Sequence, residues 1–582
     1  MEEFVIRRGD VTFEPSSYQK DILKFAKYGD GNCFIEACAG ASKTTMLENI
    51  MYVLPETHKK LFIAFNKSIA EEMKNRISGV DNVKICTYHS LGFDILRENF
   101  PDKDFIVDVD KYKRYLRENI LTLTSFGEID SLGVNKNTYL TNIVHLIEYA
   151  RYYHKSHVIH IRNIAEEFNL IIQRDEPRVV QKILEWGKNN TQTIDYTDMI
   201  WLVNEFNLTT RKLLFNHILI DEAQDTSVMQ KEMVERCAKR GARYFIVGDE
   251  HQSINVWCGS DMDAVRKFKD DKCKVFTLPI SYRCAKKIVD IAKKYSPDII
   301  AADNAIEGEI NYNVPYGSPK GNDMVLCRNT APLIEYYLKL LKINKKCYIK
   351  GQEGVLAKYI GLIEESNATL IDKECLTFDG LIPKLYEKLL INYDKLIENG
   401  YTSDEAYHHD SIINLYDDII ALIALSDCIT TTEELVNKIK TIFSVRDVDG
   451  IMLTTVHKAK GLEADNVFIL EPSLLPSKFV TKEWEIKSEQ HLVYVAYTRA
   501  KKTLNFIEEN TKKFNCGAAF NYKKMKENIE GMRLRLNFNI ANGVNEGNIS
   551  EKITNLTTFT PKVTVEVKTG DSKKPSRFTN MF

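Results

Sequence analysis

The chain has 582 residues, of which 44% are hydrophobic and 27% are charged, and its formal net charge is −2. This length exceeds what one hydrophobic core supports, which excludes a single-domain protein. The near-neutral charge excludes a uniformly basic nucleic-acid binder, so any track for phosphates must be local. No run approaches the roughly 18 apolar residues that cross a bilayer, so we expect no membrane association.

The twelve cysteines form no CxxC pair and no Cys/His set at zinc spacing, so the sequence predicts no metal centre built on thiolates. Many thiols without a disulfide framework are typical of cytosolic proteins. The N-terminal MEEFVIRRGD also lacks the apolar core of a signal peptide. We therefore expect a soluble protein of the cytoplasm, or of the nucleoid or nucleus.

Apolar runs alternate with helical patterns over the first ninety residues. CFIEA at 33–37 precedes the helix-like KTTMLENIMYVL, and KLFIAFN and VKICTYHS enclose SIAEEMKNRI. Residues 91–205 are mostly helical in period, and strand runs return as HILID (217–221), RYFIVGD (243–249) and KVFTL (274–278). We predict a parallel sheet with helices on both faces, formed by residues 1–90 and 206–285, with a helical insertion at 91–205.

The same arrangement recurs further along the chain. GEINYNV, MVLCRN and KCYIKG precede a helical, acidic stretch, after which IMLTTVHK, NVFIL and TLNFI resume the strand pattern. This predicts a second α/β domain from residues 286–352 and 447–515, with a short helical insertion at 353–446. We expect a helical extension at 516–540 and a flexible tail at 541–582, because the tail cannot bury enough apolar area.

A basic and aromatic stretch, EYARYYHKSH at 148–157, lies in the first insertion. Its Tyr149, Arg151, Tyr152, Tyr153 and Lys155 fit two interpretations, a track for DNA or a helix with a buried aromatic face. We favour the helix.

The segment ACAGASKTT at 37–45 resembles the phosphate-binding pattern GxxxxGK[ST], with Ala37 and Ser42 at the two glycine positions. Backbone N–H groups of such a loop cradle phosphates, Lys43 would bind the β- and γ-phosphates, and Thr44 would hold Mg²⁺. Ser42 would need a favourable backbone angle. The alternative is an ordinary strand-to-helix turn. The candidate nucleotide-binding residues are Ala39, Gly40, Ala41, Ser42, Lys43, Thr44 and Thr45.

HILIDEAQD at 217–225 is an apolar run that ends in adjacent carboxylates. At the carboxyl end of a strand in this class of sheet, Asp221 would lie beside the phosphate loop and hold the metal. Glu222 would orient and deprotonate the attacking water. The alternative is a solvated strand end with two acids.

DEAQD and VGDEHQSINVW (247–257) together resemble motifs II and III of the UvrD/Rep helicases. Further motifs of that family follow in the family's order over residues 18–507. They are Tyr18-Gln19, AFNKSIAEEM (64–73), TYHSLG (87–92), SYRC (281–284), TTVHKAKGLEADNVFIL (454–470) and LVYVAYTRAKK (492–502). The wording of FNKSIA, HKAKGLE and YVAYTRAKK is most similar to the F-box DNA helicase branch, although no F-box segment is evident.

The resemblance implies an α/β fold with two RecA-like parallel-sheet domains of P-loop NTPase type, each with a mainly helical insertion. It also implies ATP and Mg²⁺ as ligands. By resemblance, Gln19 reads adenine, Tyr282 stacks on it and Glu463 contacts the ribose. The family's γ-phosphate contacts match Gln252, Arg283 and Arg499, and planar guanidinium groups suit the charge spread over a transferring phosphoryl group.

DNA contacts are implied at positions that match the family's strand-binding motifs. Trp257 falls where the family has an aromatic that stacks on a base, although Asn255 and Cys258 replace the family's Tyr and Arg around it. A tryptophan in a core is the alternative. The full set of candidate DNA-binding residues is Phe65, Asn66, Thr87, Tyr88, His89, Trp257 and His457.

The resemblance therefore predicts an ATP-dependent DNA helicase that moves 3′ to 5′ on single-stranded DNA and meets duplex junctions, in replication, repair or recombination. Because the second insertion is short for this family, a translocase that displaces proteins without efficient strand separation is one alternative. A nucleotide-gated binding module with little turnover is another, and the replacements at Ala37 and Ser42 are its only support.

Two features lie near the C-terminus. VTVEVK at 563–568 contains an ExK triplet, but no upstream carboxylate set accompanies it, so we predict no nuclease. The last seven residues, SRFTNMF, end a polar tail with two aromatics and a methionine. Such a segment fits docking on a replication or repair protein, although an inert tail is the favoured interpretation.

Overall fold

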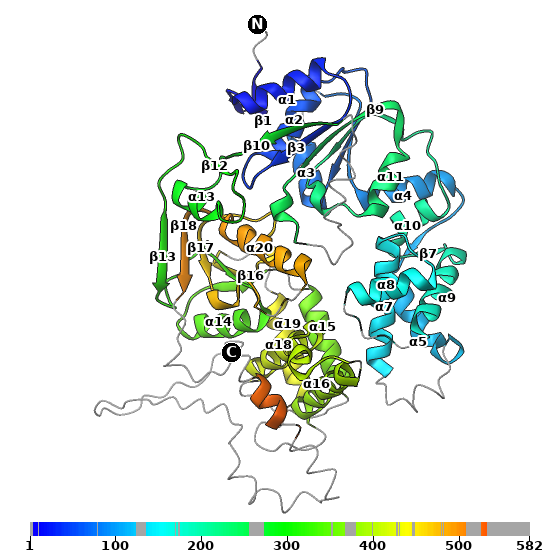
Figure 1. Ribbon diagram of the computed structural model, residues 1–582, viewed down its shortest axis with the longest axis vertical. Helices are drawn as coiled ribbons and strands as arrows, with labels where there is room; N and C mark the ends of the chain where they lie inside the picture. Colours follow the sequence, from blue (N-terminus) through cyan, green and yellow to red (C-terminus); the bar gives the residue numbers. More distant parts are fainter. Residues whose placement is uncertain are drawn as a thin grey trace, which may run out of the picture.

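A computed structural model gives the architecture (Figure 1). Among the described residues, no helix is both long enough and apolar enough to cross a membrane. Trp257 and its neighbours Asn255 and Cys258, like the tail at 541–582 with its VTVEVK and SRFTNMF segments, lie outside these residues. The structure describes residues 4–9, 11–77, 80–123, 136–168, 170, 172, 175–254, 273–350, 353–366, 380–398, 400–426, 429, 431–444, 449–478, 480, 482–507, 525–531 and 533.

The first sheet has six strands, all parallel to their neighbours. Its strands, in spatial order, are β10 (Lys274–Leu278), β3 (Cys33–Ala37), β9 (Ala238–Gly248), β8 (Phe215–Ile220), β4 (Lys60–Ala64) and β5 (Val83–Thr87). The predicted apolar runs form these strands, although β9 begins five residues before the predicted 243. The apolar runs are explained by burial on both faces of the sheet.

Alternate residues of these strands pack against different helices, as the two-residue repeat of a strand requires. Ile35 and Leu219 belong to a core with α1 (Ser17–Tyr28) and α2 (Lys43–Val53). Phe34 and Ile218 belong to another core with α4 (Tyr88–Asn99), α10 (Asp198–Glu205) and α11 (Val228–Glu235). The remaining elements of this part are α3 (Lys67–Arg76) and the hairpin of β1 (Ile6–Arg8) and β2 (Val11–Phe13).

The second sheet repeats the plan with six parallel strands. Its order is β13 (Glu309–Val314), β18 (Ala500–Ile507), β17 (Ala464–Ile469), β14 (Met324–Cys327), β16 (Ile451–Thr455) and β15 (Cys347–Ile349). The flanking helices are α13 (Lys286–Ala292), α14 (Thr330–Lys342) and α20 (Glu483–Tyr497). The short parallel pair β11 (Ile280–Ser281) and β12 (Ile300–Ala301) lies between the two sheets in sequence. The predicted α/β fold with two parallel sheets is confirmed.

Helices fill the chain between the strands of each sheet, in two segments that Figure 1 draws in cyan and in yellow-green. Before β8 come α5 (Lys111–Leu123), α7 (Lys136–Tyr152), α8 (Val158–Glu167), α9 (Glu176–Asn189) and α10, with the two-stranded pair β6 (Ile106–Val107) and β7 (Thr193–Ile194). Before β16 come α15 (Glu353–Glu365), α16 (Leu381–Glu398), α17 (Ser403–His408), α18 (Asp410–Leu425) and α19 (Thr432–Ser444).

The second helical segment shares one hydrophobic core with the second sheet. Tyr359, Leu389 and Ile419 of the helices cluster with Val325 and Leu453 of the strands. Met525 and Ile529, in the short C-terminal helix, are buried in the same core. These parts therefore pack as one body.

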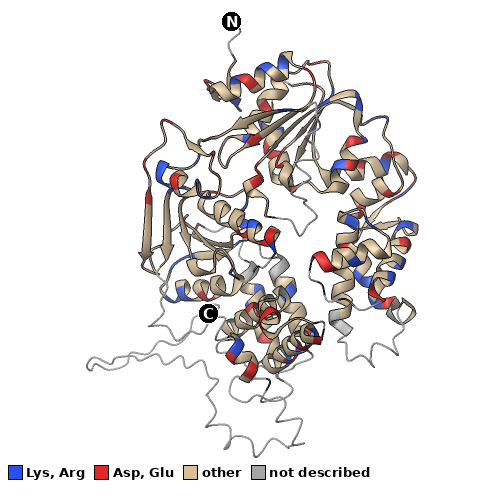
Figure 2. Cartoon of the chain, in the orientation of Figure 1, with Lys and Arg blue, Asp and Glu red and all other residues tan. Residues whose placement is uncertain are grey.

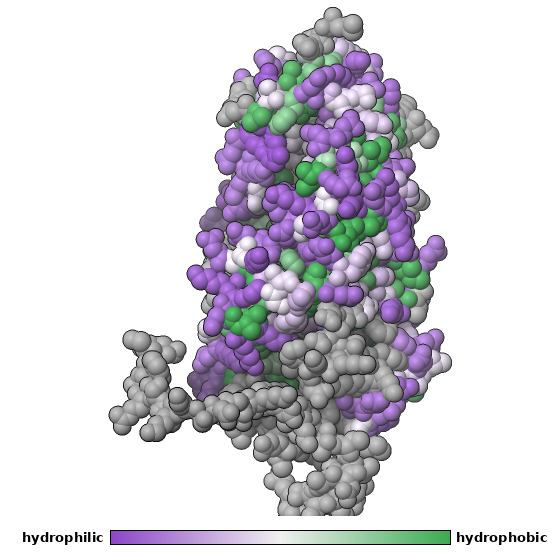
Figure 3. All heavy atoms as spheres, turned by 90° about the vertical axis from the view of Figure 1, so that its left-hand side faces the viewer, coloured by the Kyte–Doolittle hydropathy of each residue, from purple (hydrophilic) through white to green (hydrophobic). Residues whose placement is uncertain are grey.

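The face of the molecule that carries β13 and α13 is mostly hydrophilic, with apolar residues in small groups (Figure 3).

The basic and aromatic stretch at 148–157 begins in α7, which ends at Tyr152. Its tyrosines pack half-buried against the core, whereas Lys155 is exposed. Arg151 is buried, and its Nη1 lies 2.8 Å from Asp195 Oδ2 and 3.0 Å from Asp198 Oδ1. Lys111 Nζ completes the cluster at 2.7 Å from Asp198 Oδ2. Tyr149 packs its ring on Phe168, with centroids 4.5 Å apart. The favoured interpretation, a helix with a buried aromatic face, is confirmed.

Replacement of Arg151 by methionine should destabilise the first helical segment strongly. The change leaves two buried carboxylates with Lys111 as their remaining cation, which costs about 3–5 kcal/mol of unfolding free energy. Urea denaturation of the full chain, followed by tryptophan fluorescence, measures the loss. The matched control is Arg114→Met, which removes a pair with Asp108 whose arginine is 62% exposed. That pair should contribute at most about 1 kcal/mol, and equal losses in the two variants would contradict the burial argument.

Candidate active site

The loop between β3 and α2 has the backbone geometry of an anion-binding turn. Gly40 has φ +76° and Ser42 has φ +60°, so both lie in the left-handed region. Such residues turn successive N–H groups toward one side, just before the N-terminus of α2. Ser42 is the N-cap residue of α2, but its hydroxyl accepts no capping hydrogen bond. The sequence predicted that Ser42 needs a particular backbone angle to complete the loop, and its left-handed conformation supplies that angle.

Lys43 begins α2 and places a buried ammonium group beside the loop. Its Nζ lies 3.0 Å from Glu222 Oε2. This contact is an ion pair without hydrogen-bond geometry, and Nζ donates to no other group of the described chain. Burial by itself would lower the pKa of Lys43, but Glu222 and Asp249 raise it above its ordinary value. A charged, buried ammonium with unused donors fits an anionic ligand such as a phosphate.

Asp221 directly follows the last residue of strand β8 and lies beside the phosphate loop. Its Oδ2 accepts a hydrogen bond from Thr44 Oγ1 at 2.5 Å, and its Oδ1 accepts one from the Glu222 N–H at 3.0 Å. Burial and the neighbouring Glu222 raise the pKa of this carboxyl group. A buried carboxylate and a hydroxyl oxygen in contact are the hard ligands that Mg²⁺ prefers, and its charge would offset the cost of burying Asp221. The residues present therefore fit this ion.

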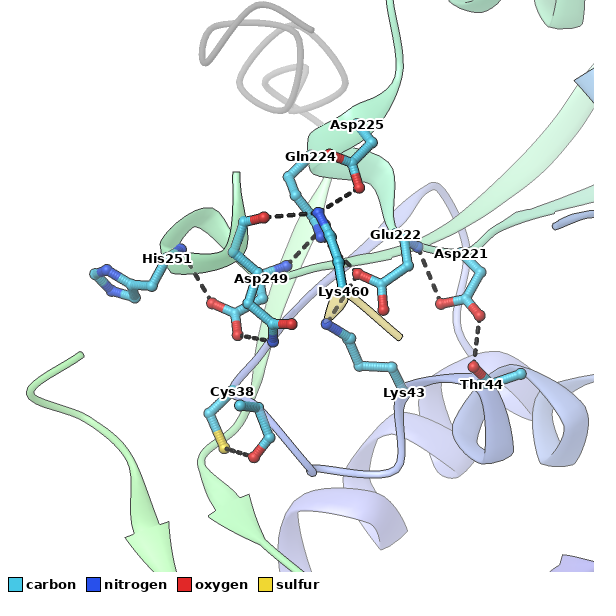
Figure 4. Close-up of polar contacts among 12 residues, drawn as sticks. Cys38, Lys43, Thr44, Asp221, Glu222, Gln224, Asp225, Asp249, His251 and Lys460 are labelled. Carbon is cyan, nitrogen blue, oxygen red and sulfur yellow. Dashed lines mark hydrogen bonds and ion pairs between the residues drawn. The ribbon is translucent and has the colours of Figure 1, made fainter. Parts of the chain in front are cut away.

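Glu222 follows in a left-handed conformation, with φ +50°. Its Oε2 accepts a hydrogen bond from Gln224 Nε2 at 2.5 Å (Figure 4). Although burial favours the neutral acid, Lys43 and Lys460 hold the pKa of Glu222 below its ordinary value. Glu222 is therefore ionised at neutral pH, as a general base must be. Backbone strain at such a residue persists only where the surroundings fix it, which is typical of active sites.

Gln252 connects the first sheet to the second. Its Nε2 donates to Asp249 Oδ2 at 2.5 Å, and its Oε1 accepts from Arg499 Nη2 at 3.4 Å. Arg499 is 1% exposed, and burial together with Arg283 lowers its pKa to about 10. Its guanidinium still carries a charge at neutral pH. It also donates to the carbonyl oxygens of Val495 and Leu462 and to Thr498 Oγ1.

Arg283 lies directly against the phosphate loop. The Tyr282 N–H donates to the Gly40 carbonyl at 3.0 Å, and a Cβ on Gly40 would come within 2.6 Å of Arg283 Cβ. Arg283 Nε donates to Glu463 Oε2 at 2.6 Å. Arg283, which the resemblance assigns to the γ-phosphate, and Glu463, which it assigns to the ribose, thus pair with each other in this structure. The Tyr282 ring is 49% exposed and free to meet a base.

Gln19 is buried in the first turn of α1. Its Oε1 accepts a hydrogen bond from the Ser16 N–H at 2.9 Å and so forms half of a capping box. The carbonyl end of the amide is therefore occupied, which leaves the NH₂ end for recognition of a base. In the loop itself, the Ala39 N–H donates to Tyr494 Oη at 2.9 Å and the Ala41 N–H to the Cys38 carbonyl at 3.3 Å.

The comparisons with known proteins agree with this geometry. A model of the UvrD/REP helicase N-terminal domain matches residues 18–273, and one of the UvrD-like helicase C-terminal domain matches residues 450–507. Together they cover more than half of the chain. The chain belongs to the UvrD/Rep helicase family.

Relatives in this family resemble the chain over most of its length. It is 24% identical, over 600 residues, to a probable DNA helicase II homolog of Mycoplasma pneumoniae, with 82% of each chain covered. It is 22% identical to the ATP-dependent DNA helicase PcrA of Staphylococcus epidermidis, with 83% of this chain and 82% of that one covered. The helicase Rep of Buchnera aphidicola is also 22% identical, over 82% of this chain and 92% of its own. The similarity to the F-box branch stays a prediction.

The predicted DNA-binding residues of this UvrD/Rep helicase differ in exposure. The Phe65 ring is 40% exposed, and His89 is also at the surface. Tyr88, in contrast, is 5% exposed and its hydroxyl lies 2.8 Å from Thr226 Oγ1. A ring packed in the core in this way cannot stack on a base, and a contact of Tyr88 with DNA by other means stays a prediction. Burial and the nearby Arg328 lower the pKa of His457 to about 3, so it is neutral.

Asn66 and Thr87 have structural tasks. The Asn66 side chain accepts a hydrogen bond from the Ile69 N–H at 2.9 Å, and Thr87 Oγ1 accepts one from the Ser90 N–H at 3.3 Å. Each residue caps the helix that follows it, α3 or α4. A strand contact through these side chains would compete with the caps.

Several groups at the site were not predicted from the sequence. Lys460 Nζ, from the loop after β16, lies 2.5 Å from Asp225 Oδ2 and 2.6 Å from the Gln252 carbonyl oxygen. Tyr494 supports the phosphate loop through Ala39. Tyr196, 55% exposed, meets His89 edge to face at 6.1 Å between ring centroids. Lys460 and Tyr494 lie within recognised motifs, but only the packing of the two sheets shows their partners.

Replacement of Ser42 by glycine should stabilise the protein. Glycine adopts φ +60° without the steric cost of a Cβ, and after the entropy of glycine is included we expect a gain of about 0.5–1 kcal/mol. Thermal unfolding of the full chain measures it. Ser227, another helix N-cap, is the control, because its φ is −77° and its side chain accepts from the Gln230 N–H. Ser227→Gly should lose stability by a few tenths of a kcal/mol, and a loss at Ser42 would contradict the strain argument.

Proposed function

We propose that this protein is an ATP-dependent DNA helicase that moves 3′ to 5′ along single-stranded DNA, in replication, repair or recombination. The main support is that Lys43 pairs with Glu222 in the first sheet's half of the site, while Gln252 of the same half accepts a hydrogen bond from Arg499, which precedes strand β18 of the second sheet. An ATP-hydrolysing site divided in this way couples hydrolysis to relative movement of its halves. Relatives with 82% coverage are named DNA helicases, which supports DNA as the substrate.

Each residue of the site then has a task in hydrolysis. Apart from those of Ala39 and Ala41, which donate within the protein, the N–H groups of the loop at 39–45 bind the phosphates together with the Lys43 ammonium. Thr44 and Asp221 would hold Mg²⁺, which neutralises phosphate charge when bound. Glu222 orients the attacking water and accepts its proton. Arg499 and Arg283, with Gln252 beside them, stabilise the negative charge that spreads over the transferring phosphoryl group.

Gln19 and Tyr282 are proposed to bind the adenine, and Glu463 the ribose. For this, Glu463 must exchange its contacts with Arg283 and Lys501, at 2.6 and 2.7 Å, for contacts with the nucleotide. Released Arg283 would then turn toward the γ-phosphate. Nucleotide binding would thus exchange the two ion pairs of Glu463 for its contact with the ribose and for that of Arg283 with the γ-phosphate. ATP would favour the arrangement in which the sheets are drawn together.

Four parts are proposed to act as domains with the boundaries that the sequence predicted. Residues 1–90 with 206–285 and residues 286–352 with 447–515 are the two halves of the motor. Residues 91–205 and 353–446 are their insertions. The strand would run past Phe65, His89, His457 and the segment that contains Trp257. Stacking of exposed rings on bases contributes about 1–3 kcal/mol per base, and Tyr196 beside His89 is a further candidate.

Strand displacement tests direction and function together. Duplexes with either a 3′ or a 5′ single-stranded tail are mixed with the full chain and ATP, and the released strand is quantified. We expect release from the 3′-tailed duplex alone, and no release by Glu222→Gln, which retains nucleotide binding but lacks the base. Release from the 5′-tailed duplex alone would contradict the proposed direction. DNA-stimulated hydrolysis without release from either duplex would favour the protein-displacing translocase.

A further inference from the structure

Lys460 crosses from the second sheet to two loops of the first. It follows the short 3₁₀ turn His457–Ala459, and its side chain is 10% exposed. The ammonium lies 2.5 Å from Asp225 Oδ2, whose side chain is 1% exposed, and 2.6 Å from the Gln252 carbonyl oxygen. Because both partners are held by the first sheet, separation of the sheets must break both contacts.

The two loops that Lys460 contacts surround the hydrolytic base. Asp225 ends the 3₁₀ turn Ala223–Asp225, which directly follows Glu222. Between them, Gln224 donates to Glu222 Oε2 and accepts from the Asp249 N–H at 3.0 Å. The Gln252 side chain also donates a hydrogen bond to Asp249 Oδ2. Figure 4 shows the Lys460 ammonium among these groups. The position of Lys460 therefore affects the geometry of Glu222, the proposed base, and of Gln252, the proposed contact of the transferring phosphate.

The same ammonium group also lies close to the proposed strand path. It is 6.0 Å from the centroid of the Phe65 ring, which is 40% exposed. A strand that moves the Phe65 ring would thus act on Lys460. Figure 2 shows Lys and Arg interspersed with Asp and Glu along the described chain. The contacts of Lys460 link the exposed Phe65 ring to the loops around Glu222.

We propose that Lys460 is a positioning residue that makes hydrolysis depend on the bound strand. This inference rests on the proposed function. With DNA bound, the Lys460 contacts hold the loops of Asp225 and Gln252 in the arrangement that aligns Glu222 with the attacking water. Without DNA, the contacts form in only part of the molecules, and turnover is slow. The coupling is carried by a contact that is either made or broken, as energetic coupling between two sites requires.

The test compares Lys460→Met with Lys502→Met in the full chain. Lys502 is also paired with an aspartate, Asp465 at 2.6 Å, but both side chains are more than half exposed and lie in one sheet. ATP hydrolysis is measured with and without oligothymidylate, over a range of ATP concentrations. We expect Lys460→Met to lower DNA-stimulated kcat about tenfold or more, with KM for ATP within about threefold. Lys502→Met should behave as the unchanged chain does.

Two further variants separate positioning from a merely structural role. Asp225→Asn should reproduce the loss of stimulation, and Lys460→Asp combined with Asp225→Lys should recover part of it. Stimulation by DNA that survives in Lys460→Met would overturn the inference. So would a loss of basal and stimulated rates in equal proportion with a raised KM, since that pattern reports general damage. An unchanged chain that DNA does not stimulate would instead overturn the proposed function itself.

Discussion

The structure depends on a buried ammonium group, that of Lys43, whose charge is balanced within the protein by carboxylates. Burial opposes this charge, and Glu222 and Asp249 restore it. Glu222 and Asp249 follow the carboxyl ends of the neighbouring strands β8 and β9, so their positions follow from the fold. The phosphate loop must turn sharply to present Lys43, and Gly40 and Ser42 supply the left-handed residues for that turn. The order of the strands and the conformation of the phosphate loop therefore together place Lys43 beside the carboxylates that balance its charge.

Cations from outside the first sheet complete the site. Arg499 and Lys460 come from the second sheet's half, Arg283 from the segment between the sheets, and backbone carbonyls or carboxylates hold each of them. These contacts stabilise the free protein, and several of them must change when a nucleotide binds. A site assembled from two bodies in this way converts chemistry into movement, because the affinity for ATP differs between their open and closed arrangements.

The sequence predicted those features that depend on local pattern. Parallel strands buried on both faces are apolar runs, and the phosphate loop and the carboxylates of 217–225 lie at strand ends, so both sheets and the Lys43–Glu222 core of the site could be predicted. Contacts between distant segments could not. The partners of Lys460 and Tyr494 depend on how the sheets meet, and the burial of Tyr88 depends on packing against Thr226. Motif position alone therefore does not show that the Tyr88 ring is buried.

The most direct test of the divided site is ATP hydrolysis by the full chain and by Arg499→Ala, each with and without single-stranded DNA. If the sheets complete one catalytic site, DNA should stimulate the unchanged chain strongly. Loss of an arginine that stabilises the transferring phosphoryl group should lower kcat about 10³-fold, while nucleotide still binds to the first sheet. Hydrolysis by Arg499→Ala at the rate of the unchanged chain would contradict the account, because the second sheet would then have no part in the chemistry.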